Sequence, residues 1–417
     1  MISSRFFKEK QLNKIFKVAI VGGGASGLLC ATELLQNDNA LFGEQIIILE
    51  RNERVGKKLI ATGNGQGNLF NACVNLDNYH GEKGFIRAFF SAFNQINLAS
   101  YLEQLGIYTC EEEDGKIYPL SMQANSVLDN IRLFLDSKNC QVKTSFYVDN
   151  IQKKGDIFII SSGKQEILAE NVVCAFGGMA GKQYGTDGSS YKLLEKFGHK
   201  VTKLTPSLVQ LKVDLQDFKG LKGIKEKVRI TGLDNDKVLM QTYGDLLFTE
   251  YGLSGSAIFK ISSVLQSAKE PIISLEFLPS LSKEKLLNII RERKKLSYIP
   301  KEDLLLGVVN KQLGRVICKK YSKEDDVVQA LKNLRFIIKG DLGFNYAQVT
   351  KGGINTNDVN PFSFQSKLLK NLYLAGELLD VDGDCGGYNL AFCFVSGITV
   401  AKDIKKTYSG VDNGKIN

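Results

Sequence analysis

The stretch Lys17-Val-Ala-Ile-Val-Gly-Gly-Gly-Ala-Ser-Gly27 decides the fold of this chain. It begins as a short, apolar, partly β-branched segment and stops abruptly at three glycines. Residues 25–37 then carry leucine and alanine at the spacing of a helix with one apolar face. The next apolar segment, residues 45–50, is almost continuously hydrophobic, as a strand buried in a parallel sheet must be. Together the three segments predict a βαβ unit.

The glycines of this unit have separate tasks in a dinucleotide-binding turn. Gly22 permits the tight turn, Gly24 lets a pyrophosphate approach the backbone, and Gly27 lets the helix pack closely on the strand. Ala25 and Ser26 open the helix, whose unpaired N–H groups and partial positive charge attract phosphate. We therefore expect these five residues to bind the phosphates of a dinucleotide. The alternative is a glycine turn that binds nothing.

Glu50 ends the second strand, 23 residues after Gly27. A carboxylate at this place accepts hydrogen bonds from both ribose hydroxyls of an adenosine. A long loop with several glycines follows Glu50. A nicotinamide enzyme rarely needs such a loop, whereas a flavin enzyme uses its backbone to line the flavin ring. The sequence therefore predicts FAD, although a plain surface loop is a simple alternative for residues 51–58. The contacts expected along this loop come from Arg51, Lys57, Lys58, Thr62 and Gly63.

A second glycine-rich block lies near the C-terminus, at Leu372-Tyr-Leu-Ala-Gly-Glu-Leu-Leu-Asp-Val-Asp-Gly-Asp-Cys-Gly-Gly-Tyr-Asn-Leu390. A strand over residues 371–375 leads into Gly376 and Glu377, and residues 386–389 start a last helix, over 390–405. A helix N-terminus at this place suits the edge of a flavin where negative charge accumulates on reduction. The two glycine-rich blocks thus predict one FAD-binding domain built from both ends of the chain.

Asp380, Asp382 and Asp384 in this block resemble the first half of a calcium-binding loop. Such a loop has glycine at its sixth position and glutamate at its twelfth, where this chain has Cys385 and Ala391. We therefore predict no metal site. The eight cysteines form no CxxC pair, which argues against a disulfide reductase, and the chain has only two histidines.

The middle of the chain changes character at about residue 195. Residues 201–278 contain short strand-like segments, and three helices follow: one after the N-cap Ser282, one beginning at Pro300 and one over residues 325–333. We therefore expect an α/β protein whose Rossmann-type FAD-binding domain is split in sequence by an insert. The expected ranges are 1–194 and 342–417 for the FAD domain, 195–278 and 334–341 for an inserted β domain, and 279–333 for a helical subdomain.

The chain resembles the BaiN/YhiN-like family of NAD(P)/FAD-dependent oxidoreductases, of the aminoacetone oxidase type. More distant similarity links it to fumarate reductase and ketosteroid dehydrogenase flavoproteins. The resemblance runs nearly from end to end, and the C-terminal block is its most specific part. The matching segments are residues 18–27, 56–65, 246–249 with 252–255, 349–353 and 376–389.

This resemblance implies a two-part FAD domain, a β-barrel-like insert and a small helical subdomain. It implies that Glu50 binds the adenosine ribose, that Val148 contacts adenine through its backbone, and that Asn64, Gly65 and Asn68 lie along the flavin. The remaining expected FAD contacts are Ala175, Gly177, Gly376, Glu377, Gly387, Tyr388, Asn389 and Leu390.

Two departures from the family pattern leave the substrate and the proton donor open. The family usually has Arg-Cys where this chain has Gln66-Gly67, and often His where this chain has Glu250. A Glu250 carboxyl desolvated against the flavin would keep its proton and serve as the catalytic acid. The simpler interpretation is that Glu250 is a solvated turn residue, and Tyr388 is the next candidate for the acid.

The sequence thus favours an FAD-dependent oxidoreductase that reduces an unsaturated small molecule by hydride transfer from flavin N5. NAD(P)H is the expected transient donor; without a second GxGxxG after a strand, it must enter the substrate cleft and leave again. One alternative is a flavin-dependent RNA-modifying enzyme, suggested by the net charge of +9 and the basic helix 283–295, although a solvated helix face explains both. Another is a non-catalytic flavin-binding protein.

The sequence shows no secretory signal and no apolar run long enough to span a bilayer. We therefore expect a cytoplasmic protein that does not insert into membranes, with nucleic acid disfavoured as a partner. The sequence leaves the oligomeric state open.

Overall fold

The computed structural model describes residues 14–36, 42–266 and 268–412. It divides the chain into two compact units: residues 1–205 with 349–417, and residues 206–348. The sequence placed the corresponding boundaries at 194/195 and 341/342. Residues 195–205 lie in the first unit because Val201 forms a β-bridge with Ile354 and the Thr202 N–H donates to the Gly353 carbonyl at 2.8 Å. Each unit buries a hydrophobic core of its own.

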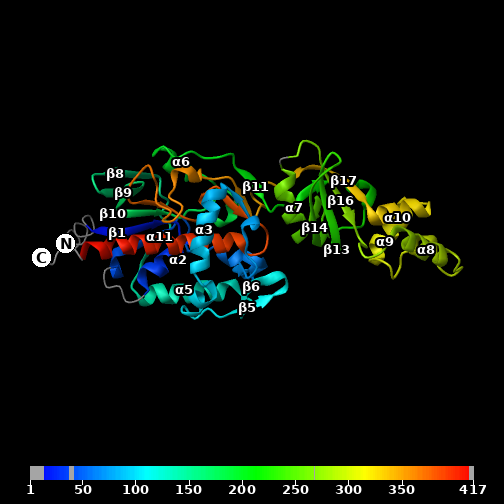
Figure 1. The fold of residues 1–417 in the computed structure, drawn as a ribbon, viewed down its shortest axis with the longest axis horizontal. Coiled ribbons are helices and arrows are strands. Elements are labelled where there is room, and N and C mark those ends of the chain that lie inside the picture. The colour runs from blue at the N-terminus through cyan, green and yellow to red at the C-terminus, as the bar shows by residue number, and fades with distance from the viewer. Residues whose placement is uncertain (1–13, 37–41, 267, 413–417) are drawn as a thin grey trace, which may run out of the picture. The chain divides into compact units, whose positions relative to one another are not determined.

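The first unit is built on a seven-stranded sheet of order β7–β2–β1–β10–β9–β8, with β19 paired to β10 (Figure 1). The pairs among β7, β2, β1, β10 and β19 are parallel, whereas β8, β9 and β10 pair antiparallel. β19, which comes latest in sequence among these seven strands, is thus separated from β1 by β10 alone. The strands are β1 (Ile15–Val21), β2 (Ile46–Leu49), β7 (Gln141–Lys143), β8 (Asn150–Lys154), β9 (Ile157–Ser162), β10 (Gln165–Cys174) and β19 (Leu372–Leu374).

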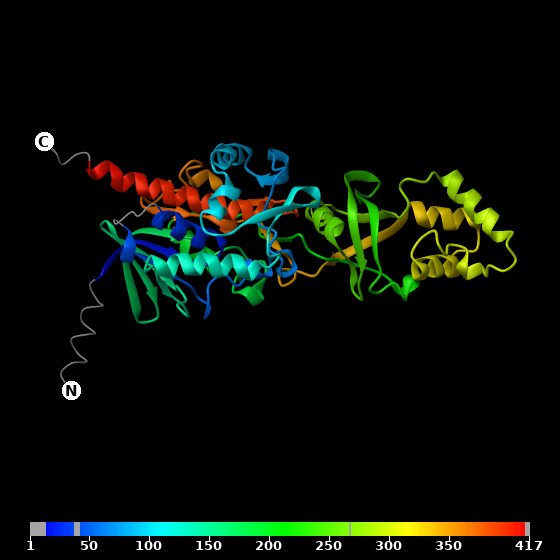
Figure 2. The ribbon, with the colours of Figure 1, turned by 90° about the horizontal axis from the view of Figure 1, so that it is seen from below.

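Two helices from opposite ends of the chain pack on this sheet. The first, α2 (Ala25–Leu35), follows the glycine turn, and the last, α11 (Tyr388–Asp412), follows the C-terminal block. They lie against each other so closely that a Cβ on Gly397 would be 2.2 Å from the Ser26 carbonyl oxygen (Figure 1 and Figure 2). The other helices of the unit are α3 (Lys83–Gln95), α4 (Leu98–Glu103), α5 (Ala124–Ser137) and α6 (Tyr191–Glu195).

Two small sheets complete the first unit. One joins β3, β6 and β5, and the other pairs β4 antiparallel with β20. The second sheet matters for the site because β20 belongs to the C-terminal glycine-rich block. The strands are β3 (Phe70–Asn71), β4 (Tyr79–Gly81), β5 (Thr109–Glu112), β6 (Lys116–Pro119) and β20 (Val381–Gly383). At the boundaries the chain runs through β11 (Thr205–Ser207) and β18 (Val349–Lys351).

The second unit is a closed six-stranded barrel, β12–β15–β14–β13–β16–β17. This confirms the barrel that the family resemblance implied. The helices of residues 283–332 lie at one end of the barrel, and the helix of residues 256–265 lies at the other (Figure 1). The strands are β12 (Leu211–Val213), β13 (Lys225–Asp234), β14 (Lys237–Phe248), β15 (Gly252–Ser254), β16 (Pro271–Glu276) and β17 (Leu334–Asp341). The helices are α7 (Ser256–Leu265), α8 (Lys283–Lys294), α9 (Lys311–Lys320) and α10 (Glu324–Lys332).

The prediction of a helix beginning at Pro300 is wrong. Only the short 3₁₀ turn η7 (Lys301–Asp303) forms there, and α9 begins later, behind the N-cap Asn310. Gly307 has a φ of +81°, which an α-helix does not accommodate, so the apolar residues around it bury themselves from a loop. The helix α7, which interrupts the strand-like region 201–278, was not predicted from the sequence.

Candidate functional site

The turn between β1 and α2 has the form that a pyrophosphate requires. A Cβ on Gly22, whose φ is +110°, would lie 2.4 Å from the Ala175 carbonyl oxygen. A Cβ on Gly27 would lie 2.0 Å from the Gly22 carbonyl oxygen, so a side chain there would push α2 away from the strand. A Cβ on Gly24 would meet nothing within 4 Å. The backbone at Gly24 therefore borders open space beside the first turn of α2, which has no side-chain cap.

The Glu50 carboxylate lies at the end of β2 and is only 7% exposed. It accepts hydrogen bonds from the glycine turn and from the loop that follows β2. Its Oε2 accepts from the Gly23 N–H at 2.8 Å, and its Oε1 accepts from the N–H and side-chain amide of Asn52 at 2.8 and 2.7 Å. Three donors hold the carboxylate in one orientation and leave lone pairs for a ligand. Glu53, by contrast, is exposed in the loop that follows.

Arg51 and Lys57 have partners within the protein. The Arg51 guanidinium binds Asp187 through two hydrogen bonds, of 2.8 and 3.2 Å, and lies over the Tyr147 ring. These bonds hold the pKa of Asp187 well below its usual range, although burial opposes the shift. Lys57 reaches the Asn52 side chain at 3.4 Å. Each cation thus has a partner within the protein, and the contact of either with FAD stays a prediction.

The loop after Glu50 folds back on itself through left-handed residues. Gly63, Asn64 and Gly65 have φ values of +57°, +55° and +87°, and the Thr62 hydroxyl donates to the Leu59 carbonyl at 2.7 Å. A Cβ on Gly65 would meet nothing within 4 Å, as at Gly24. The 3₁₀ segment η2 (Leu59–Gly65) therefore presents bare backbone to a second open place.

Asn68 joins this loop to the start of α11. Its side-chain amide donates to the Phe70 carbonyl at 3.2 Å and accepts from the Gly387 N–H at 3.3 Å. A Cβ on Gly387, whose φ is +97°, would lie 2.4 Å from the Phe70 carbonyl oxygen. Only glycine therefore allows the N-terminus of α11 to approach the loop this closely.

The C-terminal block meets the first helix at Gly376. A Cβ there would lie 2.5 Å from Ser26 Oγ, and the Ser26 hydroxyl donates to the Ala375 carbonyl at 3.4 Å. A third segment follows β10, which lies between β1 and β19. The Ala175 N–H donates to the Val21 carbonyl at 2.8 Å, and two residues later Gly177 turns the chain with a φ of +75°. The structure thus brings the predicted residues of all three segments together.

Lys58 and Glu377 form an ion pair at 2.6 Å, although 319 residues separate them. Lys58 also donates to the Ala180 carbonyl at 3.0 Å, and Glu377 Oε1 accepts from the Thr350 N–H at 3.0 Å. The two side chains are mostly buried, at 26% and 13% exposure. The sequence predicted both as FAD contacts, and in the structure they connect the two halves of the domain to each other.

The first turn of α11 contains the last three predicted residues, Tyr388, Asn389 and Leu390. The Asn389 amide accepts from the Gly383 N–H at 2.8 Å and donates to the Gly383 carbonyl at 2.7 Å, so its side chain fixes the preceding loop. Tyr388 is buried, and its carbonyl accepts from the Tyr79 hydroxyl at 2.8 Å. Leu390, like Val148 at the other end of the domain, is buried in the core.

Asp382 is a buried carboxyl that the sequence analysis considered only as part of a calcium loop. It is 3% exposed, and burial raises its pKa to about 6 against the opposing charges of His80 and Lys351. Among the residues described here, no group of three or more histidines, cysteines and carboxylates is arranged to hold a metal ion. The one sign of this burial in the sequence is that Asp382 stands between an apolar residue, Val381, and a glycine, Gly383.

Glu250 lacks the environment that a general acid requires. It lies after β14 with 69% of its side chain exposed, and its carboxylate accepts from Lys222 Nζ at 2.6 Å. The hydrogen bond and charge of Lys222 lower the pKa of Glu250, whereas the acid role needs a raised one. The expectation of a desolvated, protonated Glu250 is therefore corrected: in this structure it is an ionised residue in an exposed turn.

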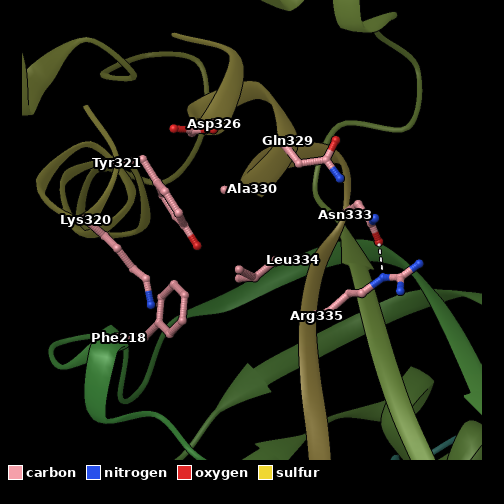
Figure 3. Close-up of a pocket in the computed structure, with 9 residues that line it drawn as sticks. All are labelled: Phe218, Lys320, Tyr321, Asp326, Gln329, Ala330, Asn333, Leu334 and Arg335. Atoms are coloured by element: carbon pink, nitrogen blue, oxygen red, sulfur yellow. Dashed lines mark hydrogen bonds between the residues drawn. The ribbon is translucent and has the colours of Figure 1, made fainter. Parts of the chain in front are cut away.

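The second unit has a hollow of about 500 Å³ between the barrel and its helices, shown in Figure 3. Lys320 on its wall lies 4.3 Å from the centre of the Phe218 ring and pairs with Asp217 at 2.6 Å. Arg335, on the other wall, donates to the Asn333 side chain at 3.2 Å. Arg335 also pairs with Asp236 at 3.1 Å, so both basic side chains of the hollow have partners. No site residue predicted from the sequence lies in it.

The chain matches the family described as HI0933-like protein Rossmann domain over residues 16–403. It belongs to the HI0933-like Rossmann family. This confirms the resemblance to BaiN/YhiN-like proteins, because the match contains both glycine-rich blocks and the whole insert between them.

Three relatives of this chain carry names of two kinds. The chain is 33% identical over 400 residues to the 3-dehydro-bile acid delta(4,6)-reductase of Clostridium scindens, covering 91% of this chain and 97% of that protein. It is 25% identical to the ribosomal RNA dihydrouridine synthase of Haemophilus influenzae and 26% identical to that of Escherichia coli. Each alignment covers 93% of this chain and 98% of the relative.

Solved structures support the fold. The 3-ketosteroid delta1-dehydrogenase of Sterolibacterium denitrificans superimposes with a TM-score of 0.53 at 10% identity, over 95% of this chain and all of that one. The E. coli quinol fumarate reductase subunit FrdA gives 0.50 at 16% identity, over 95% of this chain and 71% of that one. The chain is an FAD-dependent oxidoreductase, as its glycine-rich motifs, its family and its reductase relative together indicate.

No helix in the described part of the chain is long and apolar enough to cross a membrane.

Proposed function

We propose that this chain holds FAD and uses a reduced nicotinamide, NADH or NADPH, to reduce a carbon–carbon double bond conjugated to a carbonyl in a small, largely apolar molecule. The observation that carries the proposal is the relative of C. scindens, a named reductase that aligns over nearly the whole of both chains. Bound FAD would supply the hydride, from its N5, to the carbon remote from the carbonyl.

The residues of the first unit fit this cofactor. Open backbone at Gly24 and Gly65 marks two places that a cofactor would fill, and the Glu50 carboxylate is held near the first of them. The pyrophosphate would lie at the N-terminus of α2, the ribose at Glu50 and the flavin beside η2 and the N-terminus of α11. A helix N-terminus favours the negative charge that a flavin acquires on reduction.

The protein's own contribution is to orient the two ends of the cofactor and to exclude water between them. The Lys58–Glu377 ion pair and the Asn68 amide, which accepts from the Gly387 N–H, join the two halves of the domain. Because these links connect segments more than 300 residues apart, the flavin position depends on both halves being folded.

The test is an anaerobic experiment in two halves. The yellow holoenzyme is first mixed with NADH or NADPH, and the bleached protein is then mixed with a panel of steroid-like and simpler enones, as well as saturated ketones. We expect bleaching by one nucleotide and recovery of the oxidised spectrum with enones alone. Bleaching without recovery by any enone contradicts the proposed substrate class, and no bleaching by either nucleotide contradicts the proposed donor.

A second candidate is reduction of uracil in RNA, because two relatives are named ribosomal RNA dihydrouridine synthases. Uracil contains the same chemical group, a double bond conjugated to a carbonyl. Residues 206–348 contain 24 Lys and Arg against 17 Asp and Glu, so the second unit accounts for +7 of the net charge of +9. Recovery of oxidised flavin with an unmodified ribosomal RNA transcript, at a rate that falls steeply with salt, would favour this candidate.

A further inference from the structure

Asp382 lies opposite His80 across the small sheet of the first unit. β20 pairs antiparallel with β4, and Asp382 and His80 are direct partners in that register. Side chains of paired residues project to the same face of a two-stranded sheet. Only 3% of the surface of Asp382 is exposed. Its Oδ2 accepts no hydrogen bond from the described part of the chain. A buried carboxylate oxygen without a donor is costly while it is charged.

Four charged groups surround this carboxyl. His80 Nε2 lies 3.1 Å from Asp384 Oδ1, and this bond raises the pKa of His80. Asp380 and Asp384 repel a negative charge on Asp382, and His80 and Lys351 attract one. Burial is the largest influence, so the pKa of Asp382 is about 6, close to neutral pH. A small change in the surrounding charge is then enough to protonate or deprotonate it.

The Asp382 strand is fixed to the helix start that we assign to the flavin. The Asn389 amide, in the first turn of α11, binds the N–H and carbonyl of Gly383 and lies 3.2 Å from the Asp384 carbonyl oxygen. A Cβ on Gly383 would lie 2.8 Å from the Tyr388 Cβ, so the strand and the helix start are in contact. Charge that arrives at the N-terminus of α11 therefore acts on Asp382 through a short, mostly buried distance.

We propose that Asp382 takes up a proton from solvent when the bound flavin is reduced and gives it up when the substrate is reduced. This inference rests on the proposed function, since it needs a flavin at the start of α11. Negative charge placed there makes a second buried negative charge more costly, so the neutral carboxyl is favoured. The side chain of His80, a neighbour of Asp382 in this cluster, is 38% exposed and so reaches solvent.

The protons and electrons of the reaction balance in this scheme. A reduced nicotinamide delivers a hydride, that is, two electrons and one proton, and Asp382 Oδ2 takes one further proton. Reduction of a conjugated double bond consumes a hydride at one carbon and a proton at the other. The proton lost from Asp382 meets this demand, and Asp382 returns to the ionised state in which it started. Asp382 is therefore a proton-storing residue, and its burial separates it from a substrate.

The test measures proton uptake on reduction without any substrate or nucleotide. The holoenzyme is titrated electrochemically between pH 6.5 and 8, a range that begins just above the pKa of Asp382, and the reduced-minus-oxidised infrared spectrum is recorded. We expect one more proton per two electrons in the wild type than in Asp382→Asn. We also expect a positive C=O band of a protonated carboxyl that is absent from the variant. Asp77→Asn, which removes a carboxylate exposed before β4, is the matched control and should behave as the wild type.

Equal proton uptake in the wild type and Asp382→Asn overturns the inference, and so does the absence of a carboxyl band in the wild type. The wild-type spectrum decides the question by itself if the variant does not fold. An enzyme that contains flavin and takes up the extra proton, but reduces no enone, would retain the inference and refute the proposed substrate class. A protein that binds no FAD refutes the proposed function before Asp382 is tested.

Discussion

Replacing Glu50 by glutamine tests the adenosine end of the site, since the side chain keeps its shape and loses its charge. In the structure, three N–H groups donate to the two carboxylate oxygens, one from Gly23 and two from Asn52. A glutamine has one oxygen and one NH₂ group, so at least one of these donors must face another donor. An unsatisfied buried donor costs about 1–3 kcal/mol of folding free energy.

The loss of FAD affinity follows from the ribose. Two hydrogen bonds to a charged acceptor contribute about 1.5–3 kcal/mol each, and neutral ones roughly half as much. Glu50→Gln should therefore weaken FAD binding by about 1.5–3 kcal/mol, which is roughly 10- to 150-fold in Kd. Glu53→Gln, which removes the same charge from an exposed neighbour, should leave Kd within about twofold.

The assay is equilibrium binding of FAD to the deflavinated protein, followed by the quenching of flavin fluorescence. Circular dichroism of each variant checks that it is folded at the temperature of the measurement. Equal Kd values for the two variants would refute the reasoning, because they would place the ribose away from the end of β2. Weakened binding of FMN as well as FAD by Glu50→Gln would indicate a general distortion of the turn.

Four further predictions concern the rest of the chain. Acid precipitation should release FAD into the supernatant, and FMN or flavin in the pellet would contradict the assigned cofactor. Gly24→Ala should fold and lose FAD, whereas Gly27→Ala should lower the melting temperature even without cofactor, since a Cβ has room at Gly24 and would lie 2.0 Å from a carbonyl oxygen at Gly27. Glu250→Gln should leave flavin reduction and reoxidation unchanged, because Glu250 is exposed and paired with Lys222; reoxidation slowed about tenfold or more would restore it as the acid. The raised pKa of Asp382 contributes stability that is present below the unfolded value of about 3.8 and is lost as the pH rises through about 6. Asp382→Asn should therefore be more stable than the wild type at pH 8, by up to about 3 kcal/mol, and equally stable near pH 3.5 in thermal unfolding; a constant difference would contradict the shift.

The cofactor end of the fold could be predicted because its signals are local. Gly22, Gly24 and Gly27 each meet a steric demand within a few residues of chain, and Glu50 follows at the end of the adjacent strand. The parallel sheet and the last helix followed from apolar runs and their spacing. These features need no knowledge of distant contacts, so the sequence sufficed.

Features that depend on distant partners were missed or misplaced. The pKa of Glu250 depends on Lys222, 28 residues away, and that of Asp382 on a strand that begins near residue 79. The helix expected after Pro300 had the right apolar residues, and Gly307 redirected them into a loop packed on the second core. The partners of Lys58 and Arg51, Glu377 and Asp187, likewise lie far away in sequence, and no local pattern announced them.

The position of β19 and α11 has a consequence for how the enzyme is made. A ribosome finishes β1, α2 and β2 early, then produces the whole of residues 206–348, which are one continuous unit and can fold while still attached. At typical synthesis rates of about 5–20 residues per second, the N-terminal half waits on the order of ten seconds or more for its C-terminal partners. Because Gly376 and the start of α11 emerge only after residues 206–348, a nascent chain that still lacks them should not capture flavin. Flavin capture would thereby distinguish chains that contain both glycine-rich blocks from chains that contain only the first.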